Sequence, residues 1–218
     1  RHTGCVRDAE EKEVVRRVIE DDKQIIVLGG GNDISYPDVA GLAEAVPNPT
    51  VVNVDSHFDV RADEIRHSGT PYRQLLEENR IDPHRFHILG CKQEVNSPEY
   101  TSYLREIGAN ITWLKGLREK GIKSTVEEIL DRAGDGALFW GLDLDVVRSA
   151  DAPGVSMTYP VGLTAEEICL IAALAGRGRR SRILEISEVN PLHDVDHRTS
   201  RLAAQIIVNF LSETESPV

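Results

Sequence analysis

Short apolar runs alternate along the whole chain with longer stretches in which apolar residues recur at helical spacing. The runs expected to form strands are residues 24–29, 49–57, 85–91, 110–114, 137–147 and 182–190. The stretches with helical periodicity are residues 14–22, 37–46, 70–79, 98–108, 126–134, 164–176 and 198–211. Such alternation is typical of a parallel sheet with helices on both faces. We therefore predict one α/β domain over residues 1–218, a three-layer α/β/α sandwich around a mainly parallel sheet.

Composition and charge argue against nucleic acid and membrane as partners. The chain has 36 acidic and 25 basic side chains and a net charge of −11, whereas nucleic-acid binding needs a basic face. No apolar run approaches the roughly 20 residues of a membrane span, so no membrane partner is expected. The cysteines Cys5, Cys91 and Cys169 lie far apart without zinc-binding spacing. We expect them to be free thiols, as in cytoplasmic proteins.

Polar residues gather where the predicted strands end. Open α/β sheets bind ligands at the carboxyl ends of their strands, so these residues are candidates for a site. They are Asn32, Asp33, Asp55, His57, Asp59, Asp143, Asp145, Glu185 and Glu188.

The spacing of the aspartates and the histidine favours a metal site. Residues two apart on a strand point to the same face, so Asp55 and His57 can project together, as can Asp143 and Asp145. Carboxylates this close repel one another unless a cation offsets their charge. Mixed carboxylate and imidazole ligands suit Mn²⁺ or a similar ion, and two ions can share bridging carboxylates. Either motif alone is commonly a capping or solvated turn, and only their combination favours the metal.

The segment LGGGNDIS, residues 28–35, follows the first predicted strand. It lacks the Lys-Ser/Thr pair of a P-loop and the spacing of a dinucleotide fingerprint. Glycines at a strand exit let the backbone approach another group closely, and the predicted metal site is the candidate.

Taken in order, four segments resemble the motifs of the arginase or ureohydrolase superfamily. They are LGGGNDIS, NVDSHFDVR, GLDLDVVRSADAP and SEVNP, and the resemblance extends from about residue 24 to the last helix. Asn32 stands where most of the superfamily has histidine, which resembles the formiminoglutamase branch. Arg61 and the segment SGTPYRQ resemble that branch as well.

The resemblance implies an arginase-like fold with two Mn²⁺ ions. One ion would be held by Asn32, Asp55, Asp59 and Asp143. The other would be held by Asp55, His57, Asp143 and Asp145, so that Asp55 and Asp143 bridge. Family members begin with a further strand and helix before the first motif, so the N-terminal family strand is expected to be missing and the domain N-terminally incomplete.

The implied reaction is hydrolysis of a C–N bond at an amidine carbon. Formiminoglutamate and water would give glutamate and formamide, a step of histidine degradation. Asp145 would pass a proton to the leaving amine, and Glu188 would pair with the cationic amidine. Arg61 and Arg73 would grip the two substrate carboxylates, because guanidinium groups bind carboxylates bidentately.

Several alternatives stay open at this stage. An agmatinase or another guanidino hydrolase would leave Arg61 and Arg73 without carboxylates to bind. A binuclear hydrolase with another substrate and a non-catalytic arginase-like protein with an impaired metal site are the others. Ser68 stands where arginases place a proton-shuttling histidine, and His67 is one residue earlier. The resemblance leaves a homo-oligomer open.

Overall fold

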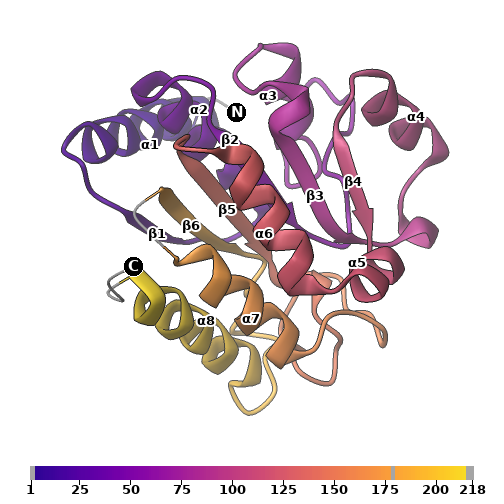
Figure 1. The fold of residues 1–218 in the computed structure, drawn as a ribbon. Helices are drawn as coiled ribbons and strands as arrows, with labels where there is room; N and C mark the ends of the chain where they lie inside the picture. The colour runs from indigo at the N-terminus through magenta and orange to yellow at the C-terminus, as the bar shows by residue number, and fades with distance from the viewer. Residues whose placement is uncertain (1–2, 178–179, 215–218) are drawn as a thin grey trace.

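The computed structural model describes residues 3–177 and 180–214, and its centre is one sheet of six parallel strands (Figure 1). The strands are β1 (Ile25–Leu28), β2 (Thr50–Val54), β3 (Phe86–Cys91), β4 (Asn110–Trp113), β5 (Leu138–Asp143) and β6 (Ser181–Ser187). Their order across the sheet is β1-β6-β5-β2-β3-β4. The central strands β2, β3 and β5 are buried along their whole length, as their apolar sequences require, and β4 at one edge is half-buried.

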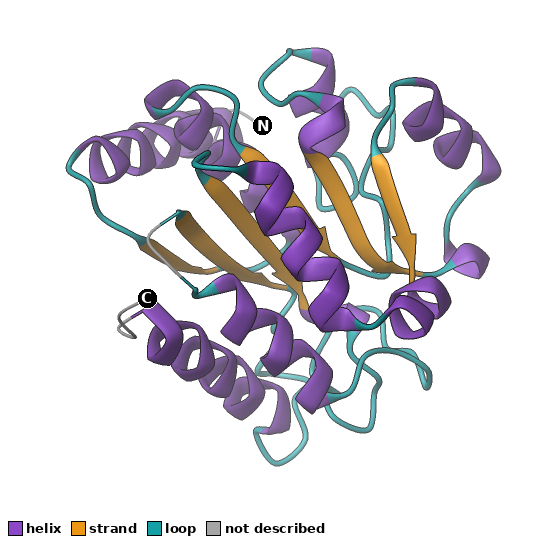
Figure 2. Cartoon of the chain, viewed as in Figure 1, coloured by secondary structure: helices purple, strands orange, loops and turns teal. Residues whose placement is uncertain are grey.

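Helices cover both faces of the sheet, which confirms the predicted three layers (Figure 2). The helices are α1 (Thr3–Glu20), α2 (Ser35–Ala45), α3 (Pro71–Glu77), α4 (Pro98–Glu106), α5 (Leu114–Lys120), α6 (Ile122–Ala133), α7 (Ala165–Ala175) and α8 (Arg198–Thr214). One apolar cluster joins α1 to α4 to one face, with Leu42 and Leu75 in it. A second cluster joins α5 to α8 to the other face, with Val126 and Ile206 in it.

Strands β2, β5 and β6 end earlier than the sequence pattern predicts, and the ends of β2 and β5 shape the site. β5 ends at Asp143, and residues Leu144–Val146 form a 3₁₀ turn in which the Asp143 carboxylate accepts a hydrogen bond of 2.8 Å from the Asp145 backbone N–H. β2 ends before Asp55, whose carboxylate accepts a hydrogen bond of 2.6 Å from the His57 backbone N–H. The expectation that strand alternation aligns these side chains was therefore wrong. Tight turns capped by the aspartates themselves bring the side chains together.

Among the described helices, none combines the length and apolar character needed to cross a membrane. Cys91 and Cys169 carry free thiols, and the side chain of Cys5 lies outside the part of the chain that the structure describes.

Asp194 caps the start of α8. Its carboxylate accepts hydrogen bonds from the backbone N–H groups of Thr199 and Ser200, at 3.0 and 2.9 Å, and from the Ser200 hydroxyl at 2.9 Å. Slight burial raises the pKa of Asp194, but these bonds outweigh it and lower the pKa to about 2. The carboxylate is thus better stabilised in the folded chain than in the unfolded one.

We expect Asp194→Ala to lower the free energy of unfolding by about 1 kcal/mol at pH 7, because it removes a helix cap. The stabilisation is present above the unfolded pKa and is lost as the pH falls through about 2. Urea denaturation at pH 7 measures the difference. Glu106→Ala, which removes an exposed carboxylate from the end of α4, is the control and leaves the free energy of unfolding nearly unchanged. Equal losses in the two variants would contradict the capping role.

Candidate metal centre

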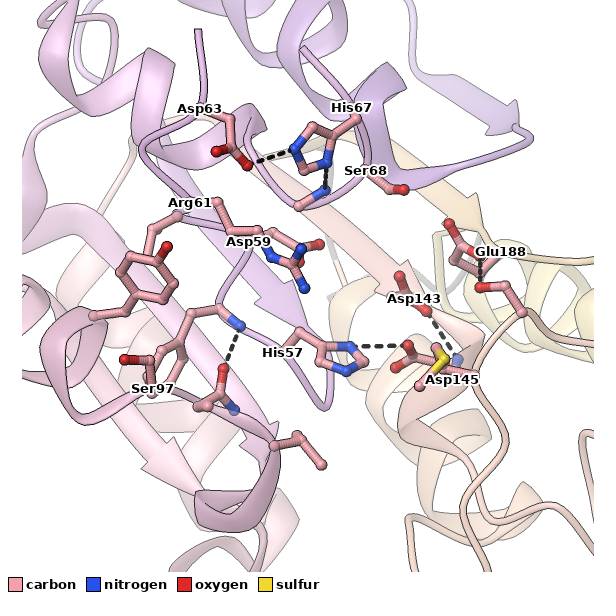
Figure 3. A pocket seen from close by; sticks show the side chains of 18 residues that line it. His57, Asp59, Arg61, Asp63, His67, Ser68, Ser97, Asp143, Asp145 and Glu188 are labelled. Carbon is pink, nitrogen blue, oxygen red and sulfur yellow. Dashed lines mark hydrogen bonds and ion pairs between the residues drawn. The ribbon is translucent and has the colours of Figure 1, made fainter. Parts of the chain in front are cut away.

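The predicted ligands and Glu188 lie at the carboxyl ends of four adjacent strands, and Figure 3 shows His57, Asp59, Asp143, Asp145 and Glu188 around one cavity. Asn32 follows β1, Glu188 follows β6, Asp143 ends β5, and Asp55 follows β2. Asp143 and Glu188 line a cavity of about 540 Å³, together with His57 and Asp59 from the segment after β2. Because neighbouring parallel strands end at the same sheet edge, residues far apart in the sequence meet here.

Two groups of ligand atoms lie close enough to share a cation. Atoms of Asp55, His57 and Asp145 lie within 4.8 Å of one another, and so do atoms of Asp55, Asp59 and Asp143. Asp55 belongs to both groups and lies between them. The five residues therefore define two adjoining positions for a cation, with one carboxylate in common.

The aspartates of this centre are buried and destabilise one another. Asp55, Asp143 and Asp145 are at most 3% exposed. Burial raises the pKa values of Asp59, Asp143 and Asp145, and the charge of Asp55 raises them further. The pKa of His57 is lowered by burial but raised more strongly by hydrogen bonds to Asp145 and Asp55. The imidazolium is thus a cation held between two carboxylates.

His57 is oriented from both sides of its ring. Its Nδ1 lies 2.9 Å from Asp145 Oδ2 and 3.4 Å from Asp55 Oδ1. Its Nε2 lies 3.0 Å from the Tyr159 hydroxyl, and the Lys92 ammonium lies 3.9 Å from the centre of the Tyr159 ring. Sequence reasoning missed Tyr159 and Lys92, because neither belongs to a metal-ligand motif. The contact between Nε2 and the Tyr159 hydroxyl leaves Nδ1 as the nitrogen that faces the carboxylates.

Asn32 is 1% exposed and lies beside Asp59. Its Nδ2 donates a hydrogen bond of 2.6 Å to Asp59 Oδ2. Its Oδ1 accepts hydrogen bonds from the hydroxyls of Ser35 and Ser187 at 2.9 and 3.0 Å. The side chain predicted to be a ligand is thus at the centre, with its amide held on both sides.

Glu188 lines the cavity with its carboxylate fixed at both oxygens. Oε1 accepts a 3.2 Å hydrogen bond from the Asn32 backbone N–H, and Oε2 accepts one from the Ser156 hydroxyl. Its φ is +63°, and that of Asp59 is +50°, in the left-handed region that residues other than glycine seldom adopt. Such conformations persist where the surrounding structure holds them and are typical of functional sites. Glu185, which the sequence places near Glu188, lies inside β6 and does not line this cavity.

The two arginines expected to bind substrate carboxylates lie in different surroundings. Arg61 lines the cavity, and no described carboxylate pairs with its guanidinium. Arg73 lies outside the cavity lining, with its Nε 2.5 Å from Glu77 Oε1 and its guanidinium 3.7 Å from the centre of the Tyr103 ring. Of these two arginines, only Arg61 faces the space in which a substrate would lie.

Ser68 and His67 both line the cavity. The two ring nitrogens of His67 are engaged, Nδ1 by the Gly69 backbone N–H at 3.1 Å and Nε2 by Asp63 at 2.8 Å. This arrangement holds the imidazole at the cavity rim beside Asp63.

The donor set of the centre fits divalent cations. Asp145 Oδ1 is buried and has no hydrogen-bond partner among the described residues, which is unfavourable for a carboxylate oxygen. Four carboxylates within one cluster, three of them buried, repel unless a positive charge lies among them, and one imidazolium offsets only part of their charge. Oxygen and imidazole donors match Mn²⁺ and similar ions. The fold and the site define a parallel α/β protein with a carboxylate-rich, two-position metal centre at its strand ends.

Comparison with known proteins agrees with that definition. The family model described as "Arginase family" matches residues 7–212, and the chain belongs to the arginase family. It is 33% identical over 190 residues to the formimidoylglutamase of Bacillus subtilis, covering 85% of this chain and 60% of the relative. It is 30% identical over 197 residues to that of Staphylococcus aureus, covering 88% of this chain and 62% of the relative. The chain thus spans about 60% of the length of these curated relatives.

Solved structures show the same fold. The crystal structure of Trypanosoma cruzi formiminoglutamase with Mn²⁺ superposes with a TM-score of 0.91 at 34% identity, covering 96% of this chain and 72% of the other. The arginase-like α/β fold expected from the sequence is confirmed.

Removing one of the repelling carboxylates should stabilise the chelated protein. We expect Asp143→Asn to raise the melting temperature in EDTA at pH 7, because a buried carboxyl with a raised pKa destabilises the fold above its unfolded pKa. The gain disappears as the pH falls below about 4, where the aspartate becomes protonated in the unfolded state as well. The same variant loses the increase in melting temperature that Mn²⁺ gives the parent chain.

Differential scanning fluorimetry with and without Mn²⁺ measures both effects. Asp63→Asn is the matched control, because Asp63 lines the cavity but its side chain is 58% exposed, and it should change neither melting temperature. A lower melting temperature for Asp143→Asn in EDTA would contradict the repulsion among these carboxylates.

Proposed function

We propose that this chain is the metal-bearing part of a manganese hydrolase that cleaves formiminoglutamate into glutamate and formamide. The observation that carries the proposal is the cluster of aspartates and His57 at the strand ends, with Glu188 and Arg61 lining the same cavity and no described carboxylate paired with Arg61. The similarity to formimidoylglutamases supports the choice of substrate. The reaction belongs to histidine degradation, and we place it in the cytoplasm, where the thiols of Cys91 and Cys169 stay free.

Two Mn²⁺ ions fit the residues present. One would be held by Asn32, Asp55, Asp59 and Asp143, and the other by Asp55, His57, Asp143 and Asp145. When bound, such ions lower the pKa of water enough to supply a nucleophile at neutral pH. They also neutralise the aspartates that otherwise repel one another.

Glu188 orients the cationic end of the substrate. Its carboxylate faces the cavity, and the Asn32 N–H and the Ser156 hydroxyl fix both oxygens. A carboxylate held in this way pairs with an amidinium group and sets the direction of its C–N bonds. Glu188 therefore contributes positioning and charge complementarity.

Asp145 is placed to move the proton. Its Oδ2 contacts His57, whereas its Oδ1 has no described partner and the residue lines the cavity. Attack of water on the amidine carbon gives a tetrahedral carbon, and the leaving nitrogen needs a proton to depart as an amine. Asp145 Oδ1 accepts the proton that the attacking water loses and passes it to that nitrogen.

Arg61 is the cation available to the dicarboxylate end of the substrate. Formiminoglutamate carries two carboxylates, and a guanidinium can bind one of them through two hydrogen bonds. Agmatine has no carboxylate, so the arginine favours the dicarboxylate substrate over that guanidino compound.

The substrate is tested by loading the chain with Mn²⁺ and offering formiminoglutamate, agmatine and arginine side by side. We expect turnover of formiminoglutamate, measured as released glutamate, and loss of that turnover on chelation, because the nucleophile depends on the ions. Preference for either guanidino compound would contradict the proposed substrate.

Arg61→Met should raise the KM for formiminoglutamate at least about tenfold, since it removes a charge-assisted contact worth roughly 1.5–3 kcal/mol. The matched control is Arg73→Met, because Arg73 contacts Glu77 and Tyr103 outside the cavity lining. Initial rates over a range of substrate concentrations give both KM values. Equal increases in the two variants would remove the role assigned to Arg61.

A further inference from the structure

A network of buried polar side chains lies beneath the metal centre, between the sheet and helices α2 and α3. Its members are Ser35, Asp38, Asn53, Tyr72 and Glu185, each 0% exposed. Tyr72 reaches into the sheet over Gly141, where a Cβ atom would come within 3.0 Å of the tyrosine hydroxyl. The reaction proposed above uses none of these side chains. Buried polar groups of this kind are unfavourable unless they are hydrogen-bonded, so their contacts identify their role.

Ser35 lies at the centre of this polar network. Its hydroxyl oxygen lies 2.5 Å from Glu185 Oε1, 2.9 Å from Asn32 Oδ1 and 3.2 Å from the Tyr72 hydroxyl. A hydroxyl has one hydrogen to donate and two lone pairs to accept with. Ser35 cannot donate to Glu185 and to Asn32 at once, so one of the two contacts must have the opposite polarity.

The orientation of the Asn32 amide decides whether Ser35 donates its hydrogen to Glu185 or to Asn32. In the structure Nδ2 faces Asp59 and Oδ1 faces the two serine hydroxyls. A ligand to a cation shared with Asp59 must present Oδ1 on that side, because an amide nitrogen is only a donor. Rotating the amide by half a turn exchanges two atoms that occupy nearly the same positions. The two Nδ2 hydrogens then point at the hydroxyl oxygens of Ser35 and Ser187.

We propose that Glu185 and Ser35 are positioning residues that hold the Asn32 amide oxygen toward the metal centre. Glu185 Oε1 accepts the Ser35 hydroxyl hydrogen, and Ser35 Oγ in turn accepts a hydrogen from Asn32 Nδ2. Each donor in this series of hydrogen bonds has one acceptor, and Asn32 Oδ1 is left free for the cation. The inference rests on the proposed function only in taking Asn32 as a metal ligand.

Asp38 completes the arrangement from α2. Apart from each other, the Asp38 carboxyl and Glu185 Oε2 have no hydrogen-bond partner among the described residues. Burial raises the pKa of both carboxyls. Asp38 raises the pKa of Glu185 further, whereas the hydrogen bond with Glu185 lowers that of Asp38. Two such carboxyls share a proton between them, as paired buried acids do. That proton leaves Glu185 Oε1 free to accept from Ser35.

Substitutions at Glu185 separate the accepting oxygen from the volume of the side chain. Glu185→Gln keeps an oxygen for Ser35 and gives an N–H to Asp38, whereas Glu185→Met fills similar space without an acceptor. We expect Glu185→Met to weaken Mn²⁺ binding about tenfold and Glu185→Gln by less than about threefold, in line with other residues that orient metal ligands. The signal of free Mn²⁺ in electron paramagnetic resonance gives the binding curve without any substrate. Equal weakening by the two substitutions would overturn the inference.

A double-mutant cycle tests the link from Ser35 to Asn32. Ser35→Ala should weaken Mn²⁺ binding about tenfold in the parent chain, because the amide then loses the acceptor that orients it. In the Asn32→Asp background the ligand has two equivalent oxygens and no preferred orientation. There Ser35→Ala should change Mn²⁺ affinity less than about threefold. Equal effects in both backgrounds, or none in either, would contradict the proposed role.

These measurements stand apart from the choice of substrate. If the Mn²⁺ affinities follow the expected pattern but the parent chain hydrolyses no formiminoglutamate, the inference stands and the proposed function is wrong. If the parent chain hydrolyses formiminoglutamate but the Glu185→Met variant binds Mn²⁺ normally, the proposed function stands and the inference is wrong.

Discussion

Repulsion among the buried carboxylates is the constraint on which the rest of this structure depends. Asp59, Asp143 and Asp145 lie close to the charge of Asp55, and burial and repulsion both raise the pKa values of these three carboxyls. The chain places them there because tight turns at the ends of β2 and β5 aim them at one point. A fold that tolerates this arrangement without a cation is less stable than its apolar core would make it. The centre is therefore a place where stability is exchanged for the capacity to bind charge.

The parallel sheet makes this exchange feasible. Its two apolar clusters cover both faces, so the strand ends stay fixed even though polar groups gather at one edge. The polar side chains are also graded by depth. Arg61, Glu188 and three of the aspartates line the cavity, whereas Ser35 and Glu185 are fully buried in α2 and the sheet. Asn32 connects the two sets, because its side chain contacts Ser35 and Asp59 and its backbone N–H donates to Glu188.

Much of this could be predicted from the sequence, for a physical reason. The alternation of apolar runs with helical periodicity indicates a covered parallel sheet, and a parallel sheet gathers the residues that follow its strands. Asp55, His57, Asp143 and Asp145 were thus found without knowing how they meet. Their turns were not predicted, because Asp143 and Asp55 are followed by apolar or small residues that continue the pattern of a strand. Ser35, Tyr72 and Glu185 were beyond reach for another reason. Their role depends on side chains that approach one another across α2, α3 and β6, and no local pattern records that approach.

The order of strands in the sheet has a consequence for how the chain folds. Asn32 and Glu188 are 156 residues apart, and their strands become neighbours only when β1 pairs with β6. Long-range parallel pairing is slow, because the entropy of loop closure is lost before the contacts form. A cation whose ligands follow β1, β2 and β5 finds no site in a partly paired sheet and cannot guide the early steps of folding. Its binding energy is present only in the completed fold, so it acts chiefly by slowing unfolding and lengthens the lifetime of the native chain.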